Sequence, residues 1–320
     1  MRLAGAWPGR GRTPARAGWR QGKPGTRPRI GGAFVALALA AVVPAFPAAA
    51  VVPAFPAAAA DAGGTVEASD QRIVFPANVQ QGAMVLGKVP PGSQVTHAGR
   101  ILRTTGYGTV VFGVGRDEAG PLQVSVEVPD GRREQVKIAV TRRDWPLQRV
   151  DGVPPRTVDP PPVIAERIRR EQARVAQARL RDDPRTDFTQ PFLRPVEGRI
   201  SGRFGRARVY NGKPGSPHSG MDIAAPTGTP VRAPAAGIVT FADADLYLTG
   251  GTVLVDHGHG ISSNFLHLSR IDVKVGDRVE QGQVIAAVGS TGRSTGPHLH
   301  WGMSWFDVRI DPQLVLERHD

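Results

Sequence analysis

The sequence predicts a mainly β protein: a small N-terminal β-sandwich-like domain, a linker helix and a C-terminal antiparallel β domain. The 320 residues include 29 prolines and 39 glycines but only 6% aromatic residues, a composition typical of chains with many turns. Short apolar or alternating runs recur between these turns, before and after one segment with helical periodicity. We therefore expect four segments, namely a leader at 1–60, an accessory domain at 61–150, a linker with a helix at 151–190, and a further domain at 191–320.

Residues 1–60 have the order of a secretory signal. Eight basic and no acidic residues occupy 1–31, and the apolar run AFVALALAAVV follows at 33–43. This run is too short to span a bilayer. We expect a cleaved signal peptide, export to the periplasm or the cell exterior, and no stable membrane span after its removal. An uncleaved anchor is the alternative.

The charge of the chain is concentrated in the leader. The formal net charge of +12 falls to +4 without it, and the rest of the chain shows no dense basic patch interleaved with aromatic residues. The sequence therefore predicts no nucleic-acid partner.

The chain has no cysteine, which excludes disulfides, thiolate metal ligands and a lipid-modified cysteine anchor.

The segment from about 65 to 145 has the pattern of a small antiparallel sandwich. Runs such as AMVLGKV, TVVFGVG and LQVSVEV are separated by the turn signals PPGS, HAGR and DEAG at roughly ten-residue spacing. It contains no cluster of catalytic residue types, so we interpret it as a spacer or binding module. His97 lies in a turn signal, and we expect it to be solvated.

A stiff, proline-rich connection follows, with VPPRTVDPPP at its centre. The spacing of apolar residues then predicts a helix over 163–183, which Pro184 ends. We expect a solvated linker helix laid against one domain. A partner-binding or regulatory helix that occludes the neighbouring domain is the alternative.

The chemistry concentrates in the last segment, since seven of the eight histidines lie between 218 and 319. In GPHLHWG, a strand would project His298 and His300 to the same face, roughly 7 Å apart. PHSGMD adds His218 and Asp222 in an H-x-x-x-D pattern. Histidine and aspartate together form a nitrogen and oxygen ligand set that suits Zn²⁺, with a fourth position left for water.

Two further imidazoles remain for handling protons beside such a metal: one member of the H-x-H pair, and His267 in NFLHLS. The residues alone do not assign ligand and helper within the pair. A second H-x-H, DHGHG at 256–260, lies between two strand-like runs, so we expect a hairpin turn there and leave His257 and His259 out of the metal site.

Four stretches in order resemble the lysostaphin-type, or LytM-like, zinc metallopeptidases, which cut peptide bonds in bacterial cell-wall peptidoglycan. They are RISGRFG at 199–205, HSGMDIAAPTGTPVRAPAAGIV at 218–239, VDHGHGISSNFLHLS at 255–269 and VKVGDRVEQGQVIAAVGSTGRSTGPHLHWG at 273–302. The resemblance covers roughly 191 to 315. It implies a compact antiparallel β fold, the duplicated hybrid motif, with a metal in a groove.

The same resemblance implies the role of each residue. One Zn²⁺ per chain would be held by His218, Asp222 and His300, with His267 and His298 as the catalytic pair. It makes 191–320 a zinc metallopeptidase domain with peptidoglycan as substrate, and other cell-wall hydrolases or division proteins as further partners. Some members of the family have lost ligands and act as non-catalytic activators. A wall-binding or amidase-activating scaffold is therefore the alternative function, although all five chemical positions are present here.

Overall fold

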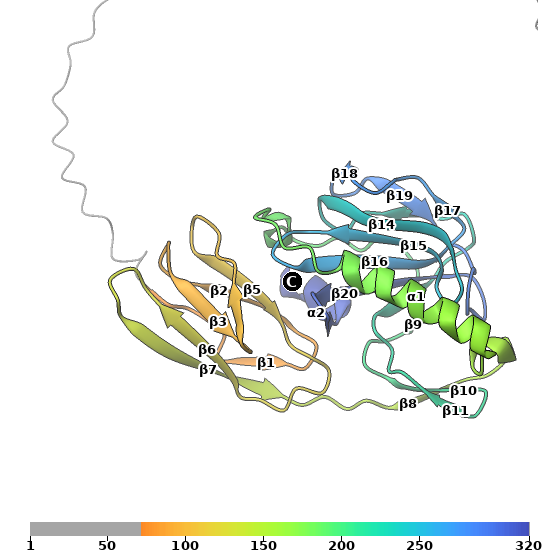
Figure 1. Ribbon diagram of the computed structural model, residues 1–320, viewed down its shortest axis with the longest axis horizontal. Coiled ribbons are helices and arrows are strands. Elements are labelled where there is room, and N and C mark those ends of the chain that lie inside the picture. The colour runs from red at the N-terminus through yellow and green to blue at the C-terminus, as the bar shows by residue number, and fades with distance from the viewer. Residues whose placement is uncertain (1–71, 320) are drawn as a thin grey trace, which may run out of the picture. The chain divides into compact units, whose positions relative to one another are not determined.

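The computed structural model describes residues 72–319, and strands joined by turns make up most of them (Figure 1). The mainly β prediction is thus confirmed. The predicted leader at 1–60 and the first residues of the accessory segment lie outside the described residues. Within 72–319, no helix combines the length and the apolar character needed to cross a bilayer.

The N-terminal part consists of two small sheets packed around one core. The five-stranded sheet has the order β1-β7-β6-β3-β4, and β2 pairs with β5. In β6, alternate side chains are buried, as expected for a strand with one face on a core. The pairing is antiparallel except between β1 and β7, which run parallel. The strands are β1 (Asn78–Gln80), β2 (Met84–Lys88), β3 (Gln94–His97), β4 (Arg100–Leu102), β5 (Thr109–Gly113), β6 (Leu122–Glu127) and β7 (Arg133–Thr141).

This part is not a separate accessory domain, because it shares its core with the residues that follow. The ring of Phe112 lies 6.3 Å from that of Trp305, measured between centroids. At Gly113 a Cβ atom would come within 2.9 Å of Trp305, so glycine permits the close approach. The predicted end of the domain at residue 150 is also wrong, since β8 (Leu147–Val150) pairs with β10 (Ala207–Tyr210).

His97 corrects another expectation. It ends β3 and is buried, with its Nδ1 2.9 Å from the carbonyl oxygen of Gln123 and its ring 4.3 Å from that of Phe112. The turn signal in the sequence is real, but the contact with Trp305 removes the imidazole from solvent. The sequence pattern contained no sign of this long-range contact.

The linker helix α1 (Pro162–Ala178) lies against β14 (Gly237–Leu246), and it ends earlier than the predicted 183. Arg167 and Arg174 pair with Asp245 and Asp243 at 3.0 and 2.9 Å. The helix thus lies against the C-terminal part, and its role as a linker stays a prediction. Near the predicted end of this segment at 190, Phe188 is fully buried in the C-terminal core.

The C-terminal part is built on an eight-stranded antiparallel sheet in the order β18-β14-β15-β16-β20-β12-β9, with β21 also paired to β20. The same part of the chain contains two separate three-stranded sheets, with the strand orders β13-β19-β17 and β11-β10-β8. The remaining elements are β9 (Arg199–Gly202), β11 (Lys213–Gly215), β12 (Met221–Ala224), β13 (Pro230–Arg232), β15 (Gly250–Asp256), β16 (Ile261–Leu268), β17 (Arg270–Ile271), β18 (Arg278–Val279), β19 (Val284–Ala287), β20 (His298–Trp305), β21 (Val308–Ile310) and the short helix α2 (Pro312–Leu316).

Candidate metal centre and catalytic groove

Three neighbouring strands of the large sheet carry the predicted site. The register of β12 on β20 places Asp222 directly opposite His300 and Ala224 opposite His298. His267 is near the end of β16, the other neighbour of β20. His218 lies in the loop just before β12. The sheet thus brings residues 218 and 300 together although 82 positions separate them in the chain.

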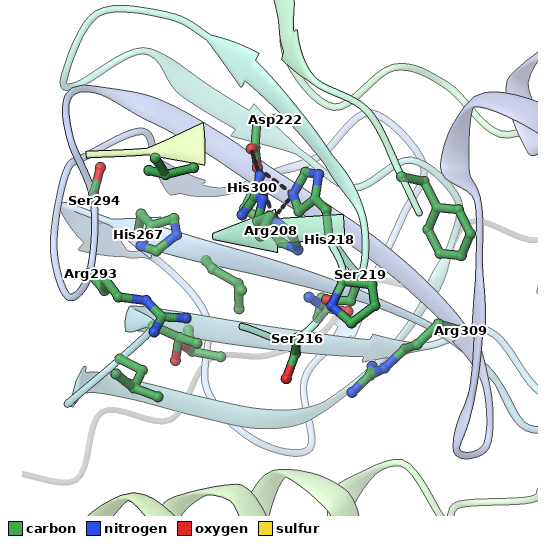
Figure 2. A pocket seen from close by; sticks show the side chains of 18 of the residues that line it. Arg208, Ser216, His218, Ser219, Asp222, His267, Arg293, Ser294, His300 and Arg309 are labelled. Carbon is green, nitrogen blue, oxygen red and sulfur yellow. Dashed lines mark hydrogen bonds and ion pairs between the residues drawn. The ribbon is translucent and has the colours of Figure 1, made fainter. Parts of the chain in front are cut away.

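Three donor atoms of this group form a small triangle, drawn with dashed lines in Figure 2. His218 Nε2 lies 2.9 Å from Asp222 Oδ1 and 3.0 Å from His300 Nδ1. The third side, from His300 Nδ1 to Asp222 Oδ1, measures 2.8 Å. All three residues are buried. Such convergence of two imidazoles and a carboxylate is the arrangement expected around one cation.

The protons available in this triangle are too few to bond all three atoms to one another. His218 Nδ1 donates to the carbonyl oxygen of Arg203 at 2.9 Å, which leaves Nε2 of the neutral ring with a lone pair. Ionised Asp222 offers only lone pairs, so His300 Nδ1 could supply at most one proton to the group. A cation at the centre would satisfy all three atoms at once, and nitrogen and oxygen ligands suit Zn²⁺.

The surroundings of Asp222 favour its ionised carboxylate form. Burial by itself would raise the pKa of its carboxyl group, but hydrogen bonds with His218 and His300 hold the pKa well below the usual value. Its second oxygen, Oδ2, accepts a hydrogen bond from Arg208 Nη2 at 2.7 Å. Arg208 belongs to β10, outside the large sheet. No motif indicates this contact, since nothing in the surrounding ARVY stretch points to a partner at position 222.

Space for the Asp222 carboxylate comes from Gly202 on β9, which pairs with Asp222. A Cβ atom at position 202 would lie 2.9 Å from the carboxyl carbon of Asp222 and still closer to Oδ2. No such contact is tolerated without movement of one partner. Glycine at this position therefore allows the carboxylate to face the two imidazoles and Arg208 together.

His267 and His298 form a second imidazole pair beside the triangle, with ring centroids 4.8 Å apart. Each donates its Nδ1 hydrogen to a backbone carbonyl at 2.8 Å, that of Thr291 for His267 and that of Gly296 for His298. In the neutral rings this leaves both Nε2 atoms as acceptors. His298 Nε2 is 3.8 Å from Asp222 Oδ1.

His267 is both buried and conformationally strained. Burial, followed by the neighbouring His298 and His300, lowers its pKa to about 3, so the ring is neutral near pH 7. Its φ of 63° lies in the left-handed region that non-glycine residues rarely adopt. Strain of this kind is typical of functional sites, where the surrounding structure imposes the conformation.

The other histidines between 218 and 300 stay outside this group, as predicted. The turn between β15 and β16 contains both His257 and His259. His257 is fully buried and bonds with the Ala236 carbonyl and the Ser263 hydroxyl at 2.7 and 2.9 Å. His259 has a φ of 50° and packs its ring against Phe188. The DHGHG motif is therefore a structural hairpin turn.

A cavity of about 1040 Å³ opens over the donor triangle. Both members of the H-x-H pair line it, as the strand alternation predicted. One wall comes from α1, and Figure 2 shows Arg293 and Arg309 reaching into the same space, with Ser216 between them. The cavity can therefore hold a substrate group against the His and Asp side chains, with basic residues around it.

Comparison with known proteins places the same region in one family. The sequence model of peptidase family M23 matches residues 216–312. The peptidoglycan DD-endopeptidase ShyA of Vibrio cholerae is 43% identical over 110 residues, which are 33% of this chain and 25% of ShyA. The DD-carboxypeptidase/endopeptidase Mpg of Neisseria meningitidis is 46% identical over 98 residues, 31% of this chain and 21% of Mpg. The matched segment thus spans a quarter or less of these relatives.

One solved structure extends the similarity to most of the described chain. A Pseudomonas aeruginosa protein assigned to peptidase M23 superposes with a TM-score of 0.57 and 32% sequence identity. The alignment covers 74% of this chain and 94% of that protein. It therefore includes much more than the segment matched by the family model. On the strength of this likeness, together with the match over 216–312, the chain belongs to peptidase family M23.

Proposed function

We propose that the protein is a zinc-dependent endopeptidase that hydrolyses peptide bonds in the stem peptides or cross-links of peptidoglycan. The observation that carries this proposal is the convergence of His218 Nε2, Asp222 Oδ1 and His300 Nδ1 within 3.0 Å of one another. The substrate class is taken from the name of the relative ShyA, a peptidoglycan DD-endopeptidase. Membership of a peptidase family supports the reaction type.

In this proposal His218, Asp222 and His300 hold one Zn²⁺, and Arg208 holds the carboxylate in place. When bound, the ion supplies a Lewis acid that polarises the scissile carbonyl and acidifies a neighbouring water molecule. The buried position of the three ligands keeps bulk water from competing for them.

We assign the proton transfers to the second imidazole pair. His298 Nε2 accepts a proton from the attacking water and returns it to the leaving amine. His267 holds a proton poorly, because its pKa is lowered to about 3, so its Nε2 orients the water by accepting a hydrogen bond. The carbonyls of Thr291 and Gly296 keep both rings in the tautomer that these roles need.

We further propose that the protein works outside the cytoplasm, since the sequence of residues 1–60 has the order of a secretory signal. Peptidoglycan is then its direct partner, and other wall hydrolases or division proteins are further candidates. A non-catalytic scaffold would have the same fold. It would require no complete ligand set, whereas all five chemical positions are occupied by the expected residue types.

The test incubates the full chain with purified peptidoglycan sacculi and identifies released fragments by mass spectrometry. We expect new amino termini, about one zinc per chain by elemental analysis, and loss of both activity and zinc in Asp222→Asn. The matched control is Asp245→Asn, because the side chain of Asp245 is 89% exposed and does not line the cavity. Zinc-loaded protein that leaves sacculi intact would contradict an enzymatic function and favour the scaffold.

A further inference from the structure

Two arginines that line the cavity have no partner among residues 72–319. Arg179 caps the C-terminal end of α1, and Arg309 lies on β21. Arg179 Nε is completely buried without a hydrogen-bond acceptor, and neither side chain forms an ion pair within the described residues. Partly buried guanidinium groups normally pair with carboxylates, since desolvating an uncompensated charge is costly. These two groups are exceptions.

The two cations also act on each other. Burial, and then the positive charge of Arg309, lower the pKa of Arg179 to about 9. Burial lowers the pKa of Arg309 as well, and Asp307 opposes this shift only through its charge, without an ion pair. A pKa of about 9 leaves Arg179 protonated near pH 7. Arg179 and Arg309 thus line the same cavity as two partly buried positive charges that repel each other.

No carboxylate of the cavity lining is free to neutralise this pair. Asp117 pairs with Arg116, and Asp222 belongs to the donor triangle and Arg208. Glu171 accepts from Arg167 Nε at 2.6 Å and from the Tyr247 backbone N–H at 2.8 Å. Every acidic side chain of the lining is thus already engaged.

The other arginines of the cavity are engaged too, which separates Arg179 and Arg309 from them. Arg293 stacks on the ring of Tyr210, with its guanidinium carbon 4.1 Å from the ring centroid, and donates to the Thr157 carbonyl at 3.1 Å. Arg116 donates to the Gly205 carbonyl at 2.6 Å. Only the pair at 179 and 309 is left without an acceptor among the basic side chains that line the described cavity.

We propose that Arg179 and Arg309 form an anion subsite that binds a carboxylate of the peptide substrate, away from the bond that is cut. Guanidinium groups match the planar carboxylate and bind it through paired hydrogen bonds. A substrate carboxylate would provide the missing acceptors and relieve the repulsion between the two cations. This inference rests on the proposed function, because it takes the occupant of the cavity to be a peptide. It also gives α1 a role in substrate binding.

The experiment uses the zinc-loaded full chain and two soluble forms of one cross-linked stem peptide, with free carboxylates or with the same groups converted to primary amides. We expect kcat/KM for the carboxylate form to exceed that for the amide form by about tenfold or more, the usual effect of a hydrogen bond to a charged group. In Arg179→Gln and Arg309→Gln this preference disappears. Both variants should lose more kcat/KM toward the carboxylate form than toward the amide form.

Arg170→Gln is the matched control, because Arg170 is exposed on the same helix and is not part of the cavity lining. It should keep the preference. The melting temperature is a second readout. Replacing an unpaired, partly buried cation should leave the melting temperature unchanged or raise it, whereas loss of a residue with a structural role would lower it. Zinc content should be equal in all four proteins.

Two results would overturn the subsite: equal kcat/KM for both peptides in the unmodified protein, or an equal loss for both peptides in the two variants. If zinc-loaded protein cleaves neither peptide, the proposed function fails, and calorimetric binding of the same peptides tests the subsite independently. Tighter binding of the carboxylate form that Arg309→Gln abolishes would support it. Equal binding of the two forms would reject it.

Discussion

Replacement of Gly202 by alanine tests the geometry of the donor triangle with one methyl group. The new Cβ would lie 2.9 Å from the carboxyl carbon of Asp222. Ordinary contacts between carbon atoms begin at about 3.5 Å, so the carboxylate or strand β9 must move by roughly 0.6–1 Å. Because Asp222 Oδ1 lies 2.8 and 2.9 Å from the two imidazole nitrogens, such a shift is large on the scale of the site.

We expect the Gly202→Ala protein to fold and to lose metal affinity and activity. Overpacking of this kind destabilises by about 1–3 kcal/mol. Disturbing a ligand or its support typically lowers metal affinity or activity about 10–100-fold. Zinc affinity is measured by competition with a chromophoric chelator, activity by release of peptides from sacculi, and folding by circular dichroism.

Gly106→Ala is the control for the general effect of exchanging glycine for alanine. A Cβ at Gly106 would meet no atom within 4 Å, and its backbone φ is not in the left-handed region. This variant should match the unmodified protein in every assay. If Gly202→Ala also binds zinc with unchanged affinity and cleaves sacculi at the unchanged rate, then the Asp222 carboxylate is not the ligand that we propose.

Three further predictions follow from individual contacts. Arg208→Gln removes the hydrogen bond to Asp222 Oδ2 and should weaken zinc binding about 10–100-fold in the chelator competition, and unchanged affinity would refute the positioning role. Phe188→Ala empties a fully buried site and should lower the free energy of unfolding by about 3–5 kcal/mol in urea denaturation, whereas a loss below about 1 kcal/mol would show that the linker end is not part of the core. Burial lowers the pKa of His257 to about 4, against 6.5 when unfolded, so the unfolded chain binds more protons between these values. The contribution of His257 to the free energy of unfolding is complete above pH 6.5 and falls by up to about 3 kcal/mol as the pH drops to 4. His257→Gln should therefore reduce the difference in stability between pH 7 and pH 4.5, as measured by thermal unfolding.

Most elements were predictable from local patterns. Alternating runs and turn signals predicted strands on both sides of one helix, and the glycines around His259 predicted a hairpin turn rather than a ligand pair. Errors arose where a distant partner decided the outcome. His97 lies in a turn signal, yet the Phe112 and Trp305 rings bury it. Residues 147–150 read as part of the first domain, yet they pair with β10.

The candidate site shows the same division. The types and the spacing of its residues in PHSGMD, NFLHLS and GPHLHWG predicted five side chains around a metal, and the family resemblance was needed to separate ligand from helper in the H-x-H pair. Arg208, Arg179 and Arg309 could not be named in this way. None of them lies in a motif, and their importance depends on which acidic groups surround them.

Sequence alone could establish which donors the chain possesses and that some of them share a strand face, because side-chain alternation is a local property of an extended backbone. Three features are visible only in the folded chain: the pairing of Asp222 with His300, the tautomers imposed by the Thr291 and Gly296 carbonyls, and the lack of acceptors around two arginines. Each of these depends on strand register and burial. Both are settled by contacts between residues far apart in the chain, and no local pattern records them.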